Sequence, residues 1–137
     1  MMQVRATSNA DFDAVDALLR ASYPALLKAD YSASILQAAL PFISRAQPKL
    51  LACGTYYGIW TDEDGLVAAG GWTHDAPYGA GQELDTAHIR HVVTDYRMIR
   101  RAYGRALMTH IIGAARASEV PIYFDGCRIL SKYGISR

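Results

Sequence analysis

The sequence predicts an α+β fold in which helices flank one mixed β-sheet. Apolar residues recur at helical spacing near both ends of the chain, β-favouring residues flank an Asp-Gly turn in its middle, and a basic turn joins a later strand to a helix. The predicted order is strand, helix, helix, a meander of three strands, helix and strand, which is the pattern of an α+β sandwich. Because 137 residues is a usual size for one domain, we expect residues 1–137 to form a single unit.

The first two predicted elements are a strand and a helix. Val4 and its neighbours suit a short edge strand. Ser8 followed three residues later by Asp11 is a variant of the capping box, which marks the start of a helix. We expect this helix to end around Tyr23-Pro24, because proline disrupts a helix interior. Its apolar residues recur at helical spacing: Phe12, Val15, Leu18 and Leu19.

A second, shorter helix and a β-hairpin are predicted next. Ser32 or Ser34 is the expected N-cap of the helix, and Pro41 should stop or kink it. Residues 50–60 and 66–73 are rich in aromatic and β-favouring residues, and a polar Asp-Gly turn separates them. This arrangement predicts a hairpin of two antiparallel strands.

The second half of the chain predicts a loop, a strand, a helix and a last strand. The loop covers residues 75–81, and the strand covers residues 87–94. Another strand begins at residues 121–124. The helix between the two strands has an apolar face made of Leu107, Met108, Ile111, Ile112 and Ala115.

Composition excludes several classes of protein. The longest apolar run is far short of the roughly 20 residues of a membrane span, and the N-terminus lacks the apolar segment of a signal peptide. We therefore expect a soluble, cytoplasmic protein without a membrane partner. A net charge of +1 gives no general attraction to nucleic acid. Cys53 and Cys127 lack metal-ligand spacing, so we expect free, buried thiols and no metal site.

A cluster of positive charge suggests a site for a small polyanion. A strand ending near Thr94 runs through a basic turn into a helix that opens near Gly104. Such a turn directs unpaired backbone N–H groups and the positive end of the helix dipole at one point, which suits a phosphate. Gly104 has no side chain to block a close approach. The arginines fall within 16 positions, and a solvated, charged loop is the alternative interpretation: Arg90, Arg97, Arg100, Arg101 and Arg105.

The same segment resembles the coenzyme A signature of the GCN5-related N-acetyltransferase (GNAT) superfamily. In that signature a strand leads into Arg/Gln-x-x-Gly-x-Gly/Ala and then a helix, and the matching run here is residues 99–104. Three positions depart from it: Ile99 replaces Arg or Gln, Ala102 replaces the first glycine, and Tyr96 replaces a proline. The resemblance implies that the phosphates of acetyl-CoA bind to Arg100, Arg101, Ala102, Tyr103, Gly104, Arg105 and Ala106.

The resemblance also implies a GNAT-like sheet and an acetyltransferase reaction. Acetyl-CoA would be the co-substrate, and a primary amine of a small molecule or a protein would attack the thioester directly. Backbone groups of Val92, Val93 and Thr94 would hold the pantetheine arm and polarise the thioester carbonyl. The superfamily adds a further helix and two strands after this point. Residues 130–135 look like a degenerate form of its next motif, so the C-terminal helix and strands are expected to be short or missing.

Three residues are candidates for proton transfer. His88 and His91 lie on the strand before the basic turn, and an ordinary histidine titrates near neutrality. Because they are three positions apart, regular alternation would place them on opposite faces of the sheet. Tyr133 lies near the position of the tyrosine that protonates the leaving thiolate in the superfamily. A histidine on a strand is more often structural than catalytic, and weaker candidates for the base are His74, Glu83 and Asp85.

Two other functions compete with the acetyltransferase interpretation. A GNAT-like module that binds acyl-CoA or a protein partner without turnover would explain the altered turn and the short C-terminus. A dinucleotide-binding protein would need Gly-x-Gly-x-x-Gly after an early strand, which the sequence lacks. A short C-terminus would leave the sheet edge near residues 122–124 uncovered, so we expect a homo-oligomer. Four aromatic residues could line an acceptor pocket, although core packing is the more common role of such residues: Tyr56, Tyr57, Trp60 and Trp72.

Overall fold

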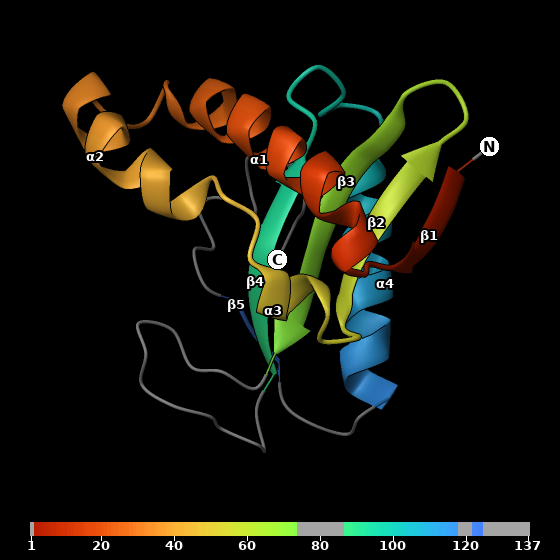
Figure 1. The fold of residues 1–137 in the computed structure, drawn as a ribbon. Coiled ribbons are helices and arrows are strands. Elements are labelled where there is room, and N and C mark those ends of the chain that lie inside the picture. Colours follow the sequence, from red (N-terminus) through yellow and green to blue (C-terminus); the bar gives the residue numbers. More distant parts are fainter. Residues whose placement is uncertain (1, 74–86, 118–121, 125–137) are drawn as a thin grey trace.

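A five-stranded β-sheet forms the centre of the computed structural model, which describes residues 2–73, 87–117 and 122–124. The strand order is β1-β2-β3-β4-β5 (Figure 1). The first four strands pair antiparallel, and β5 pairs parallel to β4. The strands are β1 (Met2–Ala6), β2 (Tyr56–Thr61), β3 (Gly65–Thr73), β4 (Ala87–Thr94) and β5 (Ile122–Phe124). The predicted α+β class with a mixed sheet is therefore confirmed.

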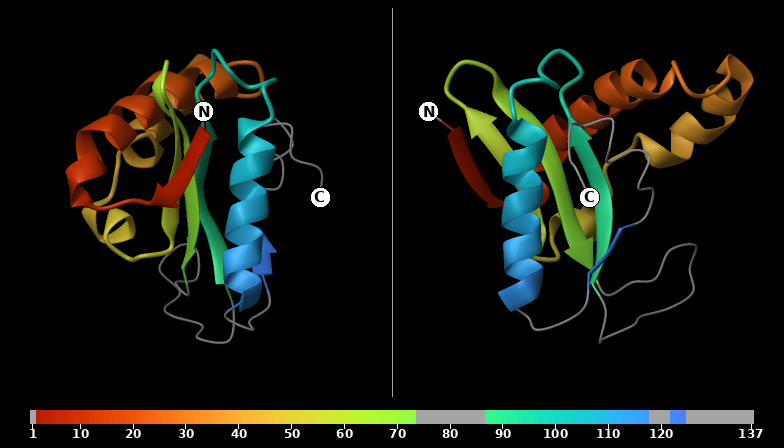
Figure 2. Two further views of the ribbon diagram at one scale, coloured as in Figure 1. Left: turned by 90° about the vertical axis from the view of Figure 1, so that its right-hand side faces the viewer. Right: turned by 180° about the vertical axis from the view of Figure 1, so that it is seen from behind.

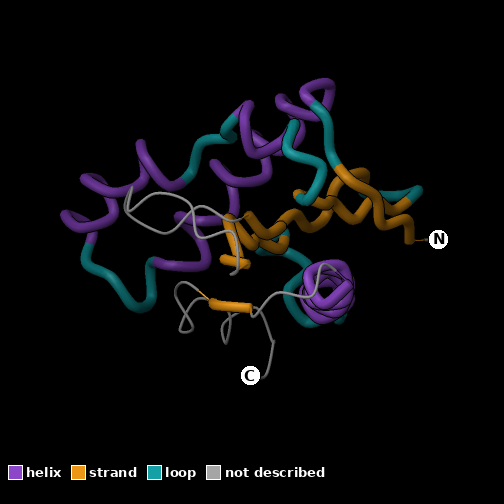
Figure 3. Tube along the Cα trace, turned by 90° about the horizontal axis from the view of Figure 1, so that it is seen from below, coloured by secondary structure: helices purple, strands orange, loops and turns teal. Residues whose placement is uncertain are grey.

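Helices cover both faces of the sheet. The short helix α3 and the long helix α1 lie on one face, and α4 lies on the other (Figures 2 and 3). Helix α2 follows α1 and extends beyond the sheet (Figure 1). The helices are α1 (Phe12–Leu27), α2 (Ala33–Ile43), α3 (Pro48–Leu51) and α4 (Tyr103–Ala117), and a 3-10 turn, η1 (Asn9–Asp11), precedes α1. Val15 and Leu19 of α1 and Leu107 and Ile111 of α4 are fully buried against the sheet.

The start of α1 agrees with the sequence, but its end does not. Ser8 and Asp11 form the predicted capping box at η1, where each side chain accepts a backbone N–H bond. The expected stop at Tyr23-Pro24 is wrong, because α1 continues through Pro24 to Leu27. Tyr23, Leu26 and Leu27 are buried, and each such side chain contributes roughly 1.5–3 kcal/mol, which offsets the lost hydrogen bond.

Two further boundaries differ from the expectation. Pro41 does not end α2, which is capped by Ser32 and runs on to Ile43. The segment expected as a strand from residue 50 begins instead as α3, and β2 starts at Tyr56. Pro48 at the first position of α3 explains this helix, because its fixed φ suits a helix start.

The structure shows how the four aromatic residues considered for an acceptor pocket are placed. Tyr56, Tyr57 and Trp72 are buried in the core, whereas Trp60 is half-buried with the Arg5 guanidinium 3.7 Å above its ring. Most of these aromatic residues therefore pack in the core.

Cys53 is free but exposed, in the loop after α3, so the expectation of a buried thiol is wrong there. Cys127 lies outside the described residues.

Candidate functional site

The outer edge of β4 is covered along part of its length. Strand β5 pairs with Ala87, His88 and Ile89. Among the described residues, no strand pairs with this edge from Arg90 to Thr94 (Figure 2). Backbone N–H and C=O groups on such an edge can bind an extended ligand as an added strand would. The open edge ends at Thr94, which is 1% exposed and whose buried hydroxyl has no hydrogen-bond partner in the described part of the chain.

A β-bulge distorts β4 at the start of this open edge. Ala69 pairs with Val93 and Gly71 pairs with Arg90, so β4 holds one residue more than β3 across this interval. His91 has a φ of 46°, a left-handed conformation that is uncommon for residues other than glycine. The bulge therefore lies at His91 and Val92.

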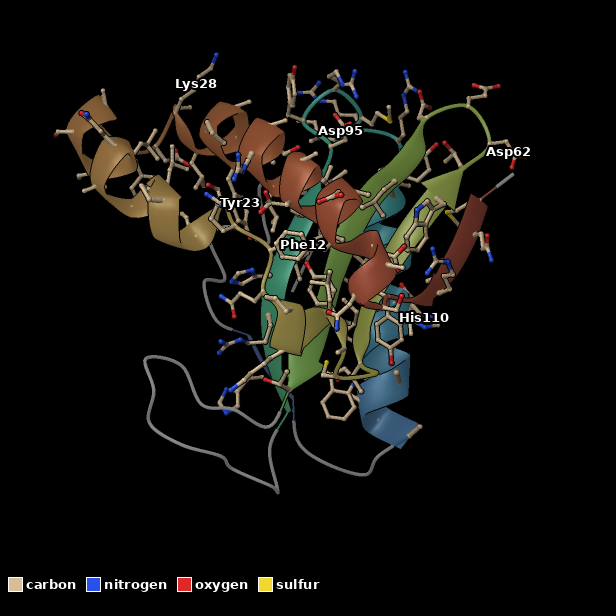
Figure 4. The ribbon with its side chains drawn as sticks, in the orientation of Figure 1. Phe12, Tyr23, Lys28, Asp62, Asp95 and His110 are labelled. Carbon is tan, nitrogen blue, oxygen red and sulfur yellow. The ribbon has the colours of Figure 1, made fainter. Side chains whose placement is uncertain are left out.

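Two buried tyrosines hold the bulge from the α1 side of the sheet. The Tyr56 hydroxyl donates a hydrogen bond of 3.0 Å to the His91 carbonyl oxygen. The hydroxyl of Tyr23, which reaches the sheet from α1, donates a bond of 3.4 Å to the Val92 carbonyl oxygen (Figure 4). Burial raises the pKa of both hydroxyls, so both stay protonated and able to donate. The sequence did not reveal this role, because nothing in a tyrosine's neighbours indicates a carbonyl partner far along the chain.

The bulge places both candidate histidines on one face of the sheet. His88 pairs with Thr73 and so shares a face with Arg90, two residues later. A Cβ at Gly70 would point at Ile111 of α4, so the alternate residue Gly71 and its partner Arg90 point to the opposite side, where α3 lies. The ring of His91 lies on that side too, because the Gln47 side-chain amide at the start of α3 is 3.5 Å from His91 Nε2. The expectation of opposite faces is therefore wrong, since the extra residue in β4 shifts the alternation.

The two histidines differ as candidates for the general base. Burial, and secondarily the positive charge of Arg90, lower the pKa of His91 from 6.5 to about 4. Such a ring is neutral at pH 7 but too weakly basic to take a proton efficiently from an ammonium group. His88 is 6% exposed and remains the predicted base. Tyr133 lies outside the described residues, so its role stays a prediction.

The lowered pKa of His91 predicts a pH dependence of stability. The unfolded chain takes up this proton near pH 6.5, whereas the folded protein resists protonation until about pH 4. The free energy of unfolding should therefore fall as the pH drops from 6.5 to 4, by at most about 1.4 kcal/mol per unit. Urea unfolding between pH 4 and pH 8 measures this slope. His91→Asn should flatten it, since asparagine tolerates a left-handed φ, and an unchanged slope would contradict the pKa.

Asp95 shapes the turn that follows β4. It is buried where β4 turns toward α4 (Figure 4), and its backbone N–H donates to the Val67 carbonyl. Its carboxylate accepts bonds from the backbone and the guanidinium of Arg97, and these side-chain bonds hold the pKa of Asp95 below its usual range. Arg97 is exposed but is paired within the turn. The other basic residues of the segment are also exposed: Arg100, Arg101 and Arg105.

The first turn of α4 presents backbone N–H groups. Both ends of the predicted phosphate site are engaged, since the Arg101 N–H donates to Met98 and the Ala106 N–H donates to Ala102. No acceptor is found among the described residues for the N–H groups of the four residues between, 102–105, of which 103–105 open the helix, as expected for a helix start. Ala102 cannot cap them with its methyl group, and the first turn holds no acidic residue. This turn therefore suits an anion, although over fewer residues than the sequence suggested.

Acidic residues border one side of this turn. Arg101 and Tyr103 line a shallow hollow together with the β2–β3 turn, which carries Asp62, Glu63 and Asp64. The side-chain hydrogen bond to Asp95 is the main cause of the raised pKa of Arg97, and the nearby charge of Asp64 adds a smaller contribution. Carboxylates repel phosphate, so an anion is favoured on the side of the turn that faces the open edge of β4.

The backbone conformation of Ala102 shows that one departure from the coenzyme A signature strains the backbone. Ala102 replaces the first glycine of the motif and has a φ of 64°, whereas Gly104 lies within α4 and has no positive φ. The left-handed region costs an L-residue roughly 1–2 kcal/mol. The turn therefore retains the conformation that glycine favours, without the glycine.

Ala102→Gly should make this turn more favourable. We expect a net gain of about 0.5–1 kcal/mol in stability, because the relief of strain exceeds the added entropy of the unfolded chain. Thermal unfolding measures the change, and Ala106→Gly, within the helix, is the matched control that should destabilise. A loss of stability in Ala102→Gly would contradict the strained turn.

Comparison with solved structures identifies the fold. The chain superimposes on the PaiA N-acetyltransferase of Thermoplasma acidophilum, solved in complex with coenzyme A, with a TM-score of 0.68 and 10% identity over 90% of this chain and 79% of that one. A GCN5-related N-acetyltransferase of Ralstonia eutropha gives 0.63 and 18% identity over 100% and 94%. The chain has the GNAT fold.

The other comparisons support the GNAT fold but do not identify a substrate. N-acetylglutamate synthase of Neisseria gonorrhoeae, solved with coenzyme A and N-acetyl-glutamate, gives a TM-score of 0.58 and 17% identity over 90% of this chain and 25% of that one. No protein-family model and no curated protein matches the sequence. Among the described residues, no helix is long and apolar enough to cross a membrane, and no cluster of three metal-ligating side chains is found.

Proposed function

We propose that the protein transfers the acetyl group of acetyl-CoA to a primary amine of a small molecule or a protein. The observation that carries this proposal is the path from the edge of β4 at Arg90–Thr94 to the amides of the first turn of α4. Within the described part of the chain, this edge has no strand partner and these amides have no acceptor. An extended pantetheine arm suits the first part, and a pyrophosphate suits the second. GNAT-fold neighbours solved with coenzyme A support the same ligand.

Backbone and basic groups share the binding of the cofactor. The N–H groups of residues 103–105 are assigned to the pyrophosphate, because helix starts favour anions. Arg100, Arg101 and Arg105 add positive charge from exposed positions. Along Val92–Thr94, backbone groups and the buried Thr94 hydroxyl are assigned to the pantetheine arm and the thioester.

The reaction is proposed as a direct attack. The amine gives up a proton to His88, directly or through a water molecule, and its nitrogen attacks the thioester carbonyl carbon. A C–N bond forms, and backbone N–H groups of the bulge region stabilise the resulting oxyanion. The intermediate then collapses, the C–S bond breaks, and the coenzyme leaves as a thiolate that accepts a proton. A thiol near pKa 8.5 is a good enough leaving group to depart without a dedicated acid.

Two measurements test the proposal. Calorimetry should detect binding of coenzyme A, and a thiol-release assay should detect acetyl transfer to at least one member of a panel of amines. Binding without transfer to any amine would instead support the non-catalytic acyl-CoA-binding module. Absence of coenzyme A binding would contradict both functions.

A further inference from the structure

Arg90 lies beside the proposed thioester site and has no ion-pair partner among the described residues. It lies at the start of the open edge of β4 and is half-buried. No carboxylate lies within ion-pair distance of its guanidinium in the described part of the chain. The described carboxylates nearest the core pair elsewhere: Asp11 with Arg5, Asp16 with Arg20 and Arg45, and Asp95 with Arg97. A half-buried guanidinium without a counter-ion is poorly satisfied, so an anionic ligand is favoured there.

The neighbours of Arg90 add hydrogen-bonding groups without adding negative charge. His91 Nδ1 is buried and has no partner among the described residues. The Gln47 side-chain amide lies 3.5 Å from the other ring nitrogen of His91. Because the lowered pKa keeps the ring neutral at pH 7, His91 neither repels Arg90 nor competes with it for an anion.

We infer that Arg90 binds a carboxylate of the acceptor, so that the substrate is an amine that carries a carboxylate a few bonds from its nitrogen, as in an amino acid. This inference rests on the proposed function and names its substrate class. Arg90 and His88 point to the same face of β4. Alternate residues on a strand lie about 7 Å apart, a span that a small amino acid covers with its carboxylate on the guanidinium and its amine near the imidazole.

The test compares acceptors that differ by one charge. The probes are the common L-amino acids and the corresponding L-amino acid amides, which keep the amine and the side chain but replace the carboxylate by a neutral carboxamide. With wild-type protein and saturating acetyl-CoA, we expect kcat/KM for at least one amino acid to exceed that for its amide by about 10-fold or more, since a hydrogen bond to a charged group contributes roughly 1.5–3 kcal/mol. This comparison needs no variant and so does not depend on folding.

Variants then assign the effect to Arg90. Arg90→Gln should raise KM for the amino acid about 10- to 100-fold with little change in kcat, and it should leave the amide unaffected. Arg90→Lys should retain part of the preference, because it keeps the charge but loses the planar fork. Arg116→Gln, which removes an exposed arginine from the last turn of α4, is the matched control and should change neither acceptor.

The outcomes separate this inference from the proposed function. Two results would overturn the inference and leave the acetyltransferase proposal standing, provided that coenzyme A binds. The first is transfer to amides as fast as to amino acids. The second is a preference for amino acids that persists in Arg90→Gln. Absence of coenzyme A binding would overturn both. An amino acid preference that Arg90→Gln removes, at an unchanged coenzyme A affinity, is the result we expect.

Discussion

His88→Ala should lower the turnover of acetyl transfer by about 100-fold or more, which is the typical effect of losing a general base. His88 is buried, shares a face of the sheet with Arg90, and lies next to the point where β5 stops covering β4. We expect a base at this position to reach an amine held near the open edge. The affinity for coenzyme A should stay nearly unchanged, because the proposed phosphate site lies at the other end of β4.

Other variants distinguish a base from a structural residue. His91→Asn should have the smaller effect on turnover, because a group with a pKa of about 4 is a weak base. Tyr133→Phe should also have a smaller effect, since the leaving thiolate needs little help from an acid. A thiol-release assay on the three variants, with calorimetry to verify coenzyme A binding, gives the comparison. An unaltered rate in His88→Ala would exclude it as the base.

The sequence predicted the elements that local chemistry determines. The capping box of Ser8 and Asp11 marked the first helix, because both partners lie within one turn. The Asp-Gly pair before residue 66 marked the hairpin of β2 and β3, where Gly65 has a positive φ. The apolar spacing of residues 107–115 predicted α4, because its buried side recurs every three or four residues.

The sequence could not predict features that depend on distant contacts. The bulge at His91 arises from the register in which β4 pairs with β3. Tyr56 and Tyr23, which are distant in sequence, donate hydrogen bonds to its carbonyl groups. A single extra residue reversed the expected faces of the strand, because alternation has a period of two. The pairing of Asp95 with Arg97 likewise required knowledge of the turn, since both residues could equally have faced solvent.

The sequence predicted the strand-to-helix turn in which the candidate phosphate site lies, and the binding of phosphate there stays a prediction. The basic, small-residue segment indicated a strand-to-helix turn, and α4 does begin at Tyr103. The glycine pattern indicated Gly104 as the key backbone position of the turn, whereas the residue with a left-handed conformation is Ala102. A motif match gives the position of a turn, but the φ of each residue follows from how the chain enters the helix.

Gly104→Val should weaken the binding of coenzyme A by roughly 10- to 100-fold. Gly104 is buried in the first turn of α4, and its amide is one of the three assigned to the pyrophosphate. A branched side chain there keeps the phosphates from approaching the amides, and the loss of a charge-assisted hydrogen bond costs about 1.5–3 kcal/mol. Calorimetry with coenzyme A measures the change, after circular dichroism has shown that the variant is folded.

Gly113→Val is the matched control, because it makes the same substitution in the same helix at a distance from the site. Gly113 is exposed, and a Cβ added there meets no atom within 4 Å. Valine has a higher helix propensity than glycine, so this variant should fold at least as well as the wild type and bind coenzyme A with the same affinity. If folded Gly104→Val also binds coenzyme A as the wild type does, the phosphates do not lie against the first turn of α4, and the proposed path from β4 to this helix is wrong.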